Sequence, residues 1–174
     1  MALRQILTEP NKILREKSLP VEKIDADVQK LMDDMLETMY AAPGIGLAAI
    51  QVGVPKRVIV MDLSQKDQSK NPMFFVNPEI ITKSNNHSTY EEGCLSVPGQ
   101  FAEIDRPDKC HIKYLDYYGI SKEIKAEGML ATCIQHEMDH LEGILFIDYL
   151  SKLKKTMIVK KLLKRKKTLE RIVV

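Results

Sequence analysis

The sequence lacks any apolar run long enough to cross a membrane. A transmembrane helix takes about 20 consecutive apolar residues, whereas apolar stretches such as RVIVMDL at 57–63 are far shorter. The first residues, MALRQILTEPNK, also lack the apolar core and the small-residue cleavage site of a secretion signal. We therefore expect a cytoplasmic protein with no membrane partner.

Cysteine is scarce, with only Cys94, Cys110 and Cys133 among 174 residues. An odd number of cysteines cannot all pair within one chain, and none of them forms a CxxC motif, so a disulfide framework is not expected. Without an export signal, we interpret the three as reduced thiols. Hydrophobic residues make up 44%, which predicts one globular domain over residues 1–174.

The segment GIGLAAIQ at 44–51 lacks the features of a nucleotide-binding loop. It has two glycines, but not the third glycine of a dinucleotide-binding fingerprint, nor the Gly-Lys-Ser/Thr ending of a phosphate-binding loop. These absences argue against a nucleotide site in this part of the chain.

Acidic residues are nearly absent from the end of the chain. Residues 151–174 hold ten Lys and Arg side chains and one acid, Glu170, although the whole chain has a formal charge of only +2. The rest of the chain is therefore net acidic, and the basic segment predicts an anionic partner. Its apolar stripe is too thin to favour a membrane surface, and a solvated terminal helix is the plain alternative. We expect no DNA partner.

Apolar residues recur at helical spacing in several segments. The clearest helix is predicted over residues 25–42, where six apolar residues share a face: Val28, Leu31, Met32, Met35, Leu36 and Met39. Asp25 suits its N-terminal turn, because a carboxylate there meets free N–H groups. A second helix is predicted from about Glu127 to Leu141, with Gly143 beyond its end. A third begins near Leu150 and forms a basic tail at about 150–174.

Between residues 44 and 125 the pattern changes to short runs rich in β-branched and aromatic residues. Strands are predicted at residues 57–63, 73–81 and 110–119, and residues 121–128 are expected to pair with the last of these across a turn at Tyr118–Gly119. Helix, several short strands and helix indicate an α+β fold. We expect antiparallel or mixed sheets wrapped around a central helix, with an N-terminal and a C-terminal helix besides.

The run QHEMDH at 135–140 carries an H-E-x-x-H pattern. His136 and His140 are four residues apart, so they share a helix face at a distance of about 6 Å and can hold one cation. Glu137 is rotated away from them by about 100°, which suits proton transfer rather than ligation. An exposed helix with two unrelated histidines would have the same sequence pattern.

A catalytic metal of this type needs a third protein ligand and an open position for water. No histidine follows His140, which argues against the long metzincin signature. A distal carboxylate is one candidate for the third ligand. Cys94, in EEGCLSVPG at 91–99, is another, because a bound cation would keep its sulfur deprotonated. A buried structural cysteine is the commoner outcome, and the spacing does not decide among these.

Three segments taken together resemble the peptide deformylase family: GIGLAAIQVG at 44–53, EGCLS at 92–96 and QHEMDHLEG at 135–143. Their order and approximate spacing match, and the likeness extends from the first helix to residues 145–151. The resemblance implies a bacterial or organellar enzyme that removes the formyl group from the N-terminal methionine of nascent proteins and releases formate.

The resemblance also implies roles for individual residues. The metal ligands would be Cys94, His136 and His140. Metal-bound water would attack the formyl carbon while Glu137 acts as general acid and base, and Gln51 and the Leu95 N–H would stabilise the oxyanion. The implied metal is one Fe²⁺ per chain, although His₂Cys ligation would also accept Zn²⁺, Ni²⁺ or Co²⁺.

The resemblance implies that N-formylmethionyl peptides bind by strand addition at Gly44, Ile45 and Gly46. Met129 and Cys133 stand seven and three residues before His136, so they share its helix face and would line an apolar methionine pocket. Packing in the core is the alternative for both.

Glu92 and Gly93 in the cysteine loop complete the predicted substrate site, and the role of Phe101 is left open. Glu92 and Gly93 precede Cys94; the resemblance puts Glu92 near the entrance, and a structural hydrogen-bonding role is its alternative. Phe101 stands where the family often has a basic residue, so its contact with the far end of a peptide is left open.

Other interpretations concern the partner and the reaction class. Because the substrate would emerge from the ribosome, the basic tail is predicted to dock on ribosomal RNA. A general H-E-x-x-H metallopeptidase would require neither Cys94 nor Gln51. A non-catalytic peptide-binding homologue would usually have lost Glu137.

Overall fold

A computed structural model describes residues 2–65 and 68–172, with side chains up to residue 169. The predicted domain over residues 1–174 includes Met1 and residues 173–174, which lie outside the described residues, and it stays a prediction. Within the described part, no helix is long and apolar enough to span a bilayer.

The described residues form helices, short 3₁₀ helices and strands in this order: η1 (Lys12–Arg15), α1 (Ala26–Ala41), β1 (Gly46–Ala48), η2 (Ala49–Val52), β2 (Val58–Met61), β3 (Met73–Lys83), β4 (His87–Cys94), β5 (Val97–Pro107), β6 (Lys109–Leu115), β7 (Ser121–Glu127), α2 (Gly128–Leu141), η3 (Phe146–Tyr149) and α3 (Lys152–Ile172).

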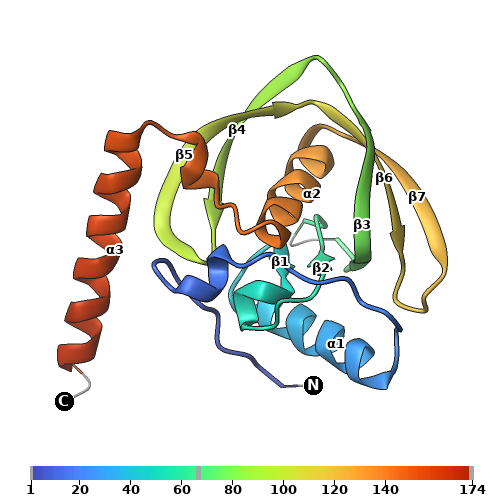
Figure 1. Cartoon of the computed structure of the whole chain (residues 1–174), viewed down its shortest axis with the longest axis horizontal. Helices are drawn as coiled ribbons and strands as arrows, with labels where there is room; N and C mark the ends of the chain where they lie inside the picture. The colour runs from blue at the N-terminus through green and yellow to red at the C-terminus, as the bar shows by residue number, and fades with distance from the viewer. Residues whose placement is uncertain (1, 66–67, 173–174) are drawn as a thin grey trace.

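The strands make two antiparallel sheets around α2 (Figure 1). One sheet has five strands in the order β1-β2-β3-β6-β7, and the other pairs β4 with β5. β6 and β7 form the predicted hairpin, in a register that runs from Leu115 opposite Ser121 to Lys109 opposite Glu127. The predicted α+β fold, with sheets around a central helix, is confirmed.

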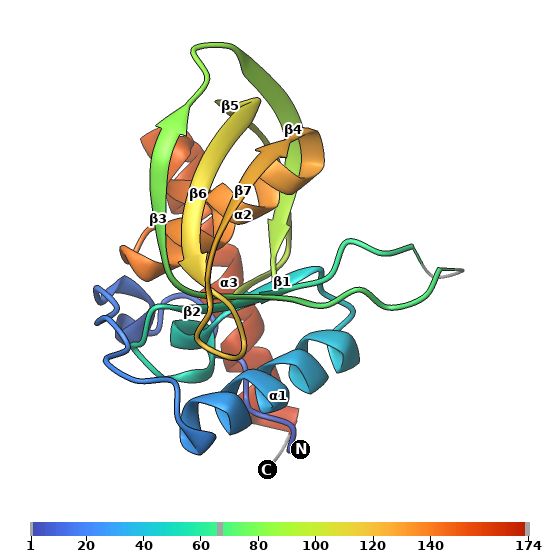
Figure 2. The same cartoon turned by 90° about the vertical axis from the view of Figure 1, so that its right-hand side faces the viewer.

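The alternation of side chains along β2 places one helix on each side of the sheet. Val58 and Val60 pack with α1, whereas Ile59 and Met61 pack with α2. Successive side chains of a strand point to opposite faces, so a four-residue apolar strand can serve two cores. Figure 2 shows α1 beneath this part of the sheet, on the side away from α2.

The predicted first helix is confirmed as α1. The Asp25 side chain accepts a hydrogen bond from the Val28 N–H at its N-terminus, as a capping residue does. The predicted apolar face is buried, except that Leu36 is only partly covered. Methionines on this face fill the core beside β2, which is their usual role.

The predicted second helix is confirmed as α2, and it is buried along most of its length. Gly143 follows it with φ of 74°, in the left-handed region where helices commonly end on glycine. A Cβ at Gly143 would also collide with the Arg15 backbone, whose carbonyl carbon lies 2.7 Å from its ideal position. The helix that bears the histidines therefore ends against η1.

The C-terminal helix α3 packs outside β5 (Figure 1). Ile158 and Leu162 join a third apolar cluster with Val97, Ile104 and Phe146. The remaining positions from 152 to 169 are exposed or half-buried. The prediction of a basic terminal helix is therefore confirmed up to Ile172.

Candidate metal centre and substrate pocket

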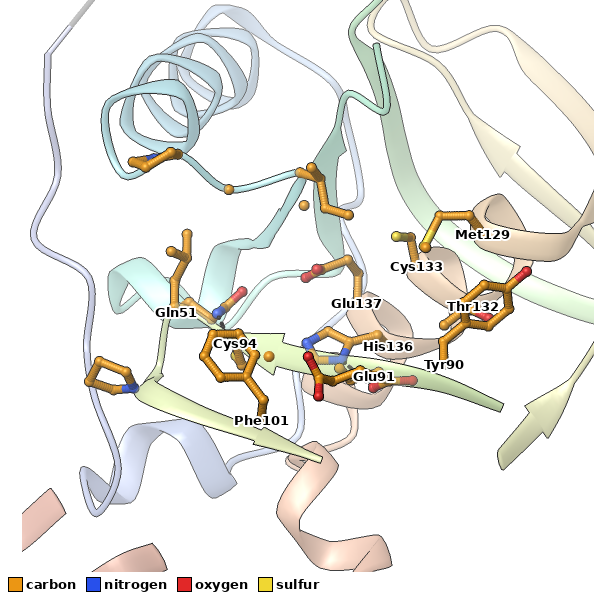
Figure 3. Close-up of a pocket in the computed structure, with 18 of the residues that line it drawn as sticks. Gln51, Tyr90, Glu91, Cys94, Phe101, Met129, Thr132, Cys133, His136 and Glu137 are labelled. Atoms are coloured by element: carbon orange, nitrogen blue, oxygen red, sulfur yellow. Dashed lines mark hydrogen bonds and ion pairs between the residues drawn. The ribbon is translucent and has the colours of Figure 1, made fainter. Parts of the chain in front are cut away.

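A cavity of about 450 Å³ opens beside α2 (Figure 3). The segment before β1 and the end of β4 supply two of its walls, and α2 supplies a third. Every site residue predicted from the sequence lines this cavity except His140, which lies beneath it, next to Cys94. Segments that are far apart in the chain therefore meet at one place.

Cys94, His136 and His140 offer ligand atoms that lie within 4.8 Å of one another. Cys94 is the last residue of β4, and its Sγ is 3.3 Å from Nε2 of His140. The histidines come from successive turns of α2, with ring centroids 5.1 Å apart. One sulfur and two imidazole nitrogens at this spacing fit a divalent transition metal. Among the described residues, the group of possible ligand atoms at the histidine pair is completed by the Cys94 sulfur and not by a carboxylate.

The neutral state of His140 supports this fit. Burial lowers the pKa of His140, and the neighbouring His136 lowers it further, so the ring is neutral as a metal ligand must be. Burial also disfavours charge on His136, but hydrogen bonds with Cys94 and Glu92 raise its pKa.

Glu92 orients His136. Its Oε2 lies 2.8 Å from Nδ1 of His136, which leaves Nε2 as the nitrogen that can ligate. A carboxylate behind a ligating imidazole fixes the tautomer and makes the ring a better donor. Burial raises the pKa of Glu92, but the hydrogen bonds from His136 and Arg106 outweigh burial and lower it. Glu92 is therefore an anion, and the structural hydrogen-bonding role is the one that its contacts support.

Arg106 extends this chain of contacts away from the cavity. The buried guanidinium donates to both oxygens of Glu92, at 2.6 and 3.1 Å, and to Oδ2 of Asp139 at 2.7 Å. The Tyr149 hydroxyl donates to the same Asp139 oxygen at 2.8 Å. This network could not be inferred from the sequence, because nothing in the spacing links Glu92 to a residue fourteen positions later.

The Glu137 carboxylate lies in the cavity without a partner. Its Oε2 is buried and makes no hydrogen bond to the described residues. Burial raises the pKa of Glu137 to about 7, and the nearby Glu92 contributes in the same direction. Gly46 faces it closely, since the Glu137 Cδ lies 2.8 Å from where a Gly46 Cβ would stand. Only glycine at position 46 leaves this carboxylate in place.

The Gln51 amide is held in one orientation. Its Oε1 accepts from the Ala48 N–H at 2.8 Å, so its Nε2 must face Ser96 Oγ at 3.0 Å and Cys94 Sγ at 3.5 Å. Leu95 follows Cys94 in the turn between β4 and β5. Among the described residues, its N–H donates to no protein acceptor. The Gln51 amide therefore lies beside the sulfur, and the Leu95 N–H belongs to the residue that follows it.

The far end of the cavity is apolar. Met129 and Cys133 line it from α2, together with Tyr90 from β4 (Figure 3). Burial raises the pKa of Cys133 to about 12, so this thiol stays neutral and behaves as an apolar group. Cys110 is buried elsewhere, between β3 and β7.

Comparison with known proteins now identifies the family. A model of the polypeptide deformylase family matches residues 3–156. A peptide deformylase of Pelagibacter ubique is 66% identical over 166 residues, which are 95% of this chain and 96% of that protein.

Solved structures point to the same family. Peptide deformylase from Ehrlichia chaffeensis in complex with actinonin is 46% identical with a TM-score of 0.91, over 95% of this chain and 98% of that one. A Met-Ala-Ser-bound peptide deformylase from Acinetobacter baumannii is 33% identical with a TM-score of 0.82, over 86% of this chain and 99% of that one. The chain therefore belongs to the polypeptide deformylase family, as an enzyme whose Cys94, His136 and His140 form the metal site typical of it.

Proposed function

We propose that this chain hydrolyses the formyl amide of N-formylmethionyl peptides in the bacterial cytoplasm, which frees the amino terminus of new proteins and releases formate. The convergence of Cys94, His136 and His140 within 4.8 Å, beside the buried Glu137, carries the proposal. Family membership supports the reaction, and the Met-Ala-Ser peptide bound by the Acinetobacter baumannii relative supports a chain that begins with methionine.

The cation is proposed to be Fe²⁺, one per chain. The donor set would also take Zn²⁺, Ni²⁺ or Co²⁺. When bound, the cation supplies Lewis acidity toward the formyl oxygen and lowers the pKa of water. A thiolate beside ferrous iron is open to oxidation, so the iron-loaded enzyme should lose activity in air. Full activity after long aerobic incubation, with iron still bound in its original state, would contradict Fe²⁺.

Glu137 holds and moves the proton. Its Oε2 has no protein partner among the described residues, and burial raises its pKa above the usual range of a glutamate. A carboxyl group with such a pKa can take a proton from the attacking water and give it to the methionine nitrogen as the formyl C–N bond breaks. The space left by Gly46 lets the carboxylate reach both positions.

Gln51 and the Leu95 N–H donate to the negative charge that develops on the formyl oxygen. The amide of Gln51 is oriented before substrate binds, because the Ala48 N–H holds its oxygen. Removing one fixed donor of this kind costs about 2.7–4 kcal/mol in the transition state. We therefore expect Gln51→Ala to lower kcat by about 100-fold without loss of the metal.

The peptide backbone is proposed to pair with β1, which is an edge strand. The Ile45 carbonyl accepts from the Asp62 N–H on the β2 side. Because backbone groups of alternate residues point to opposite edges, Gly46 directs its groups to the unpaired edge. The Gly44 N–H already donates to the Met39 carbonyl at 2.9 Å, so Gly44 would offer a peptide only its carbonyl. An extended peptide can add there as a further strand, with Gly93 across the cavity.

Formate release is the first test. The protein is loaded with Fe²⁺ without air and given formyl-Met-Ala-Ser, with acetyl-Met-Ala-Ser as the substrate control. We expect fast release from the formyl peptide only, and a loss of at least about 100-fold in Glu137→Gln. Metal content measured on both proteins keeps an effect on catalysis apart from an effect on loading. No release by the folded, loaded parent would contradict the proposal.

We also propose that α3 docks on ribosomal RNA. Its lysines and arginines from 152 to 169 are exposed, apart from the half-buried Lys155. Arg165 Nη1 lies 3.4 Å from the ideal Cβ position of Gly99, which lines the cavity. The basic helix therefore runs beside the cavity, and an RNA bound to it would hold the cavity near the emerging chain.

Co-sedimentation with ribosomes over a salt series tests the docking. One variant replaces four exposed α3 lysines by glutamine: Lys160, Lys161, Lys164 and Lys167. The matched control replaces four exposed sheet lysines: Lys83, Lys109, Lys113 and Lys125. We expect only the α3 variant to lose binding and to show a flatter salt dependence. Equal binding by both variants would contradict docking through α3.

A further inference from the structure

Phe101 is a large apolar side chain held at the mouth of the cavity. It lines the cavity while 65% of it is exposed. It pairs with Gly93 in the β4–β5 register, and a Cβ on Gly93 would come within 2.5 Å of the ring atom Cε1. The ring therefore rests on the Gly93 backbone, and its other side faces the space that a peptide would enter.

Ile45 is a second exposed apolar residue in the same cavity wall, with 49% of it accessible. Its backbone is fixed by the hydrogen bond of 3.0 Å from the Asp62 N–H to its carbonyl. Phe101 is fixed by its place in β5. Ile45 directly before β1 and Phe101 within β5 both have a hydrogen-bonded backbone, so they are a pre-formed surface, which binds without the cost of ordering a loop.

The direction of the cavity indicates which peptide residue meets this surface. In Figure 3, Met129, Cys133 and Tyr90 lie at one end, whereas Phe101 lies toward the other beside Cys94, with Glu91 and His136 between the two ends. With the formyl group at the metal ligands, the methionine side chain extends toward the Met129 end. Side chains of an extended peptide alternate in direction, so the next side chain points toward Phe101.

We propose that Phe101, together with Ile45, selects for a large apolar side chain on the residue that follows formylmethionine. The inference rests on the proposed deformylase function and adds the class of substrate that this chain prefers. An apolar side chain there would cover the exposed ring and leave water. The exposed Glu91 also lines the cavity, so an acidic residue at the same peptide position meets a like charge.

A purely structural role for Phe101 has different consequences. If the ring only covers the Gly93 backbone, its removal lowers stability and slows all peptides by the same factor. If it contacts the substrate, its removal changes the ratio of rates between peptides. The ratio of kcat/KM values therefore separates the two roles.

Three formylated peptides measure that ratio: formyl-Met-Leu-Ser, formyl-Met-Ala-Ser and formyl-Met-Asp-Ser. In the parent we expect leucine to exceed alanine by about fivefold, which is modest because the surface is half open. In Phe101→Ala the leucine-to-alanine ratio of kcat/KM should fall to about 1. In Phe101→Arg the kcat/KM of the aspartate peptide should exceed that of the leucine peptide. Tyr118→Ala, which removes an aromatic ring that is 76% exposed and outside the cavity lining, should keep the parent ratio.

A binding measurement decides the inference even without turnover. Dissociation constants of the deformylated peptides Met-Leu-Ser, Met-Ala-Ser and Met-Ala-Leu are measured on the metal-loaded parent and on Phe101→Ala. The proposal is supported if the parent binds Met-Leu-Ser more tightly than Met-Ala-Ser and Phe101→Ala does not. An unchanged ratio in Phe101→Ala, or a preference that appears only in Met-Ala-Leu, would overturn it. Failure to release formate would contradict the reaction and leave this binding ratio to decide the role of Phe101.

Discussion

Gly46 leaves the space that the Glu137 carboxylate occupies. A Cβ there would meet Oε1 of Glu137 and stand 2.8 Å from its Cδ. Gly46 has no positive φ among the described glycines, so the reason for glycine is this contact and not the backbone conformation. The carboxylate cannot move back into the protein without burying its charge further.

Gly46→Ala should therefore displace the proton-transfer group. We expect kcat to fall by about 100-fold, which is the range for loss of a general acid-base group. The affinity for Co²⁺ should stay within about threefold, because no ligand is touched. Kinetics on formyl-Met-Ala-Ser and Co²⁺ titration of the same variant check this. A variant with full activity would show that the carboxylate works from another position.

The N-terminal segment is tied to α1 through one carboxylate, Asp34. It accepts from the Ala2 N–H at 2.8 Å, from Arg4 at 3.0 Å and from Lys30 at 2.9 Å. The hydrogen bond from Lys30 lowers the pKa of Asp34 most, burial opposes it, and the result is a pKa of about 2. A carboxyl whose pKa is lowered on folding stabilises the fold above its unfolded pKa of about 4.

Asp34→Asn should cost about 1–2 kcal/mol of unfolding free energy near pH 7, after allowance for the exposure of Lys30 and Arg4. The stabilisation is lost as the pH falls from about 4 toward 2, so the difference between parent and variant should shrink over that range. Urea unfolding of both proteins at several pH values measures it. A difference that does not change with pH would assign the effect to lost hydrogen bonds instead of charge.

Three elements meet in the network behind His136. Glu92 comes from β4, Arg106 from β5 and Asp139 from α2. Both side chains of the Glu92–Arg106 pair are about 95% buried. Removing one member of such a pair leaves an uncompensated charge in the protein, which is far more costly than losing an exposed pair.

Arg106→Gln should lower the unfolding free energy by about 3–5 kcal/mol. Because Glu92 would lose its anchor, the affinity for Co²⁺ should also fall by about 10- to 100-fold. Lys109→Gln is the matched control, since it breaks an exposed pair with Glu127 that is worth less than about 1 kcal/mol. Normal Co²⁺ affinity in a folded Arg106→Gln protein would contradict the orienting role.

The elements that periodicity predicts best are those that bury one continuous face. α1, α2 and β2 follow this rule, and the sequence places them within a few residues. β4 and β5 were not predicted, because they form a two-stranded sheet in which few residues are fully buried. Polar residues occupy most of their exposed positions, so the apolar pattern that marks a strand is weak. The register that pairs Gly93 with Phe101 could not be inferred for the same reason.

The candidate site likewise contains residues that local spacing predicts and a residue that only the fold brings to them. The spacing of His136 and His140 predicts a shared helix face, and the fold places the two side by side. Cys94 reaches them only because β4 ends beside α2, which is a property of the whole fold and not of local spacing. For this reason the residues alone left the third ligand open, and the family resemblance pointed to it.

At the scale of the whole molecule, three apolar clusters hold the cavity walls in place. One lies between the five-stranded sheet and α2, the second between that sheet and α1, and the third joins β5, η3 and α3. Each wall of the cavity thus rests on a different cluster. The third cluster draws on Ile158 and Leu162, which lie beyond residue 156, where the family match ends.

A chain truncated after Thr156 should therefore lose stability as well as charge. Burial of each aliphatic side chain is worth about 1.5–3 kcal/mol, so removing Ile158 and Leu162 should cost about 3–6 kcal/mol of unfolding free energy. Ile158→Ala with Leu162→Ala should be destabilised to a similar degree and still bind ribosomes, because its charges remain. The four-lysine variant of α3 should keep the parent's stability within about 1 kcal/mol and lose ribosome binding. Urea unfolding and co-sedimentation of all three proteins separate the two roles of α3, and a truncated chain as stable as the parent would mean that the helix contributes only its charge.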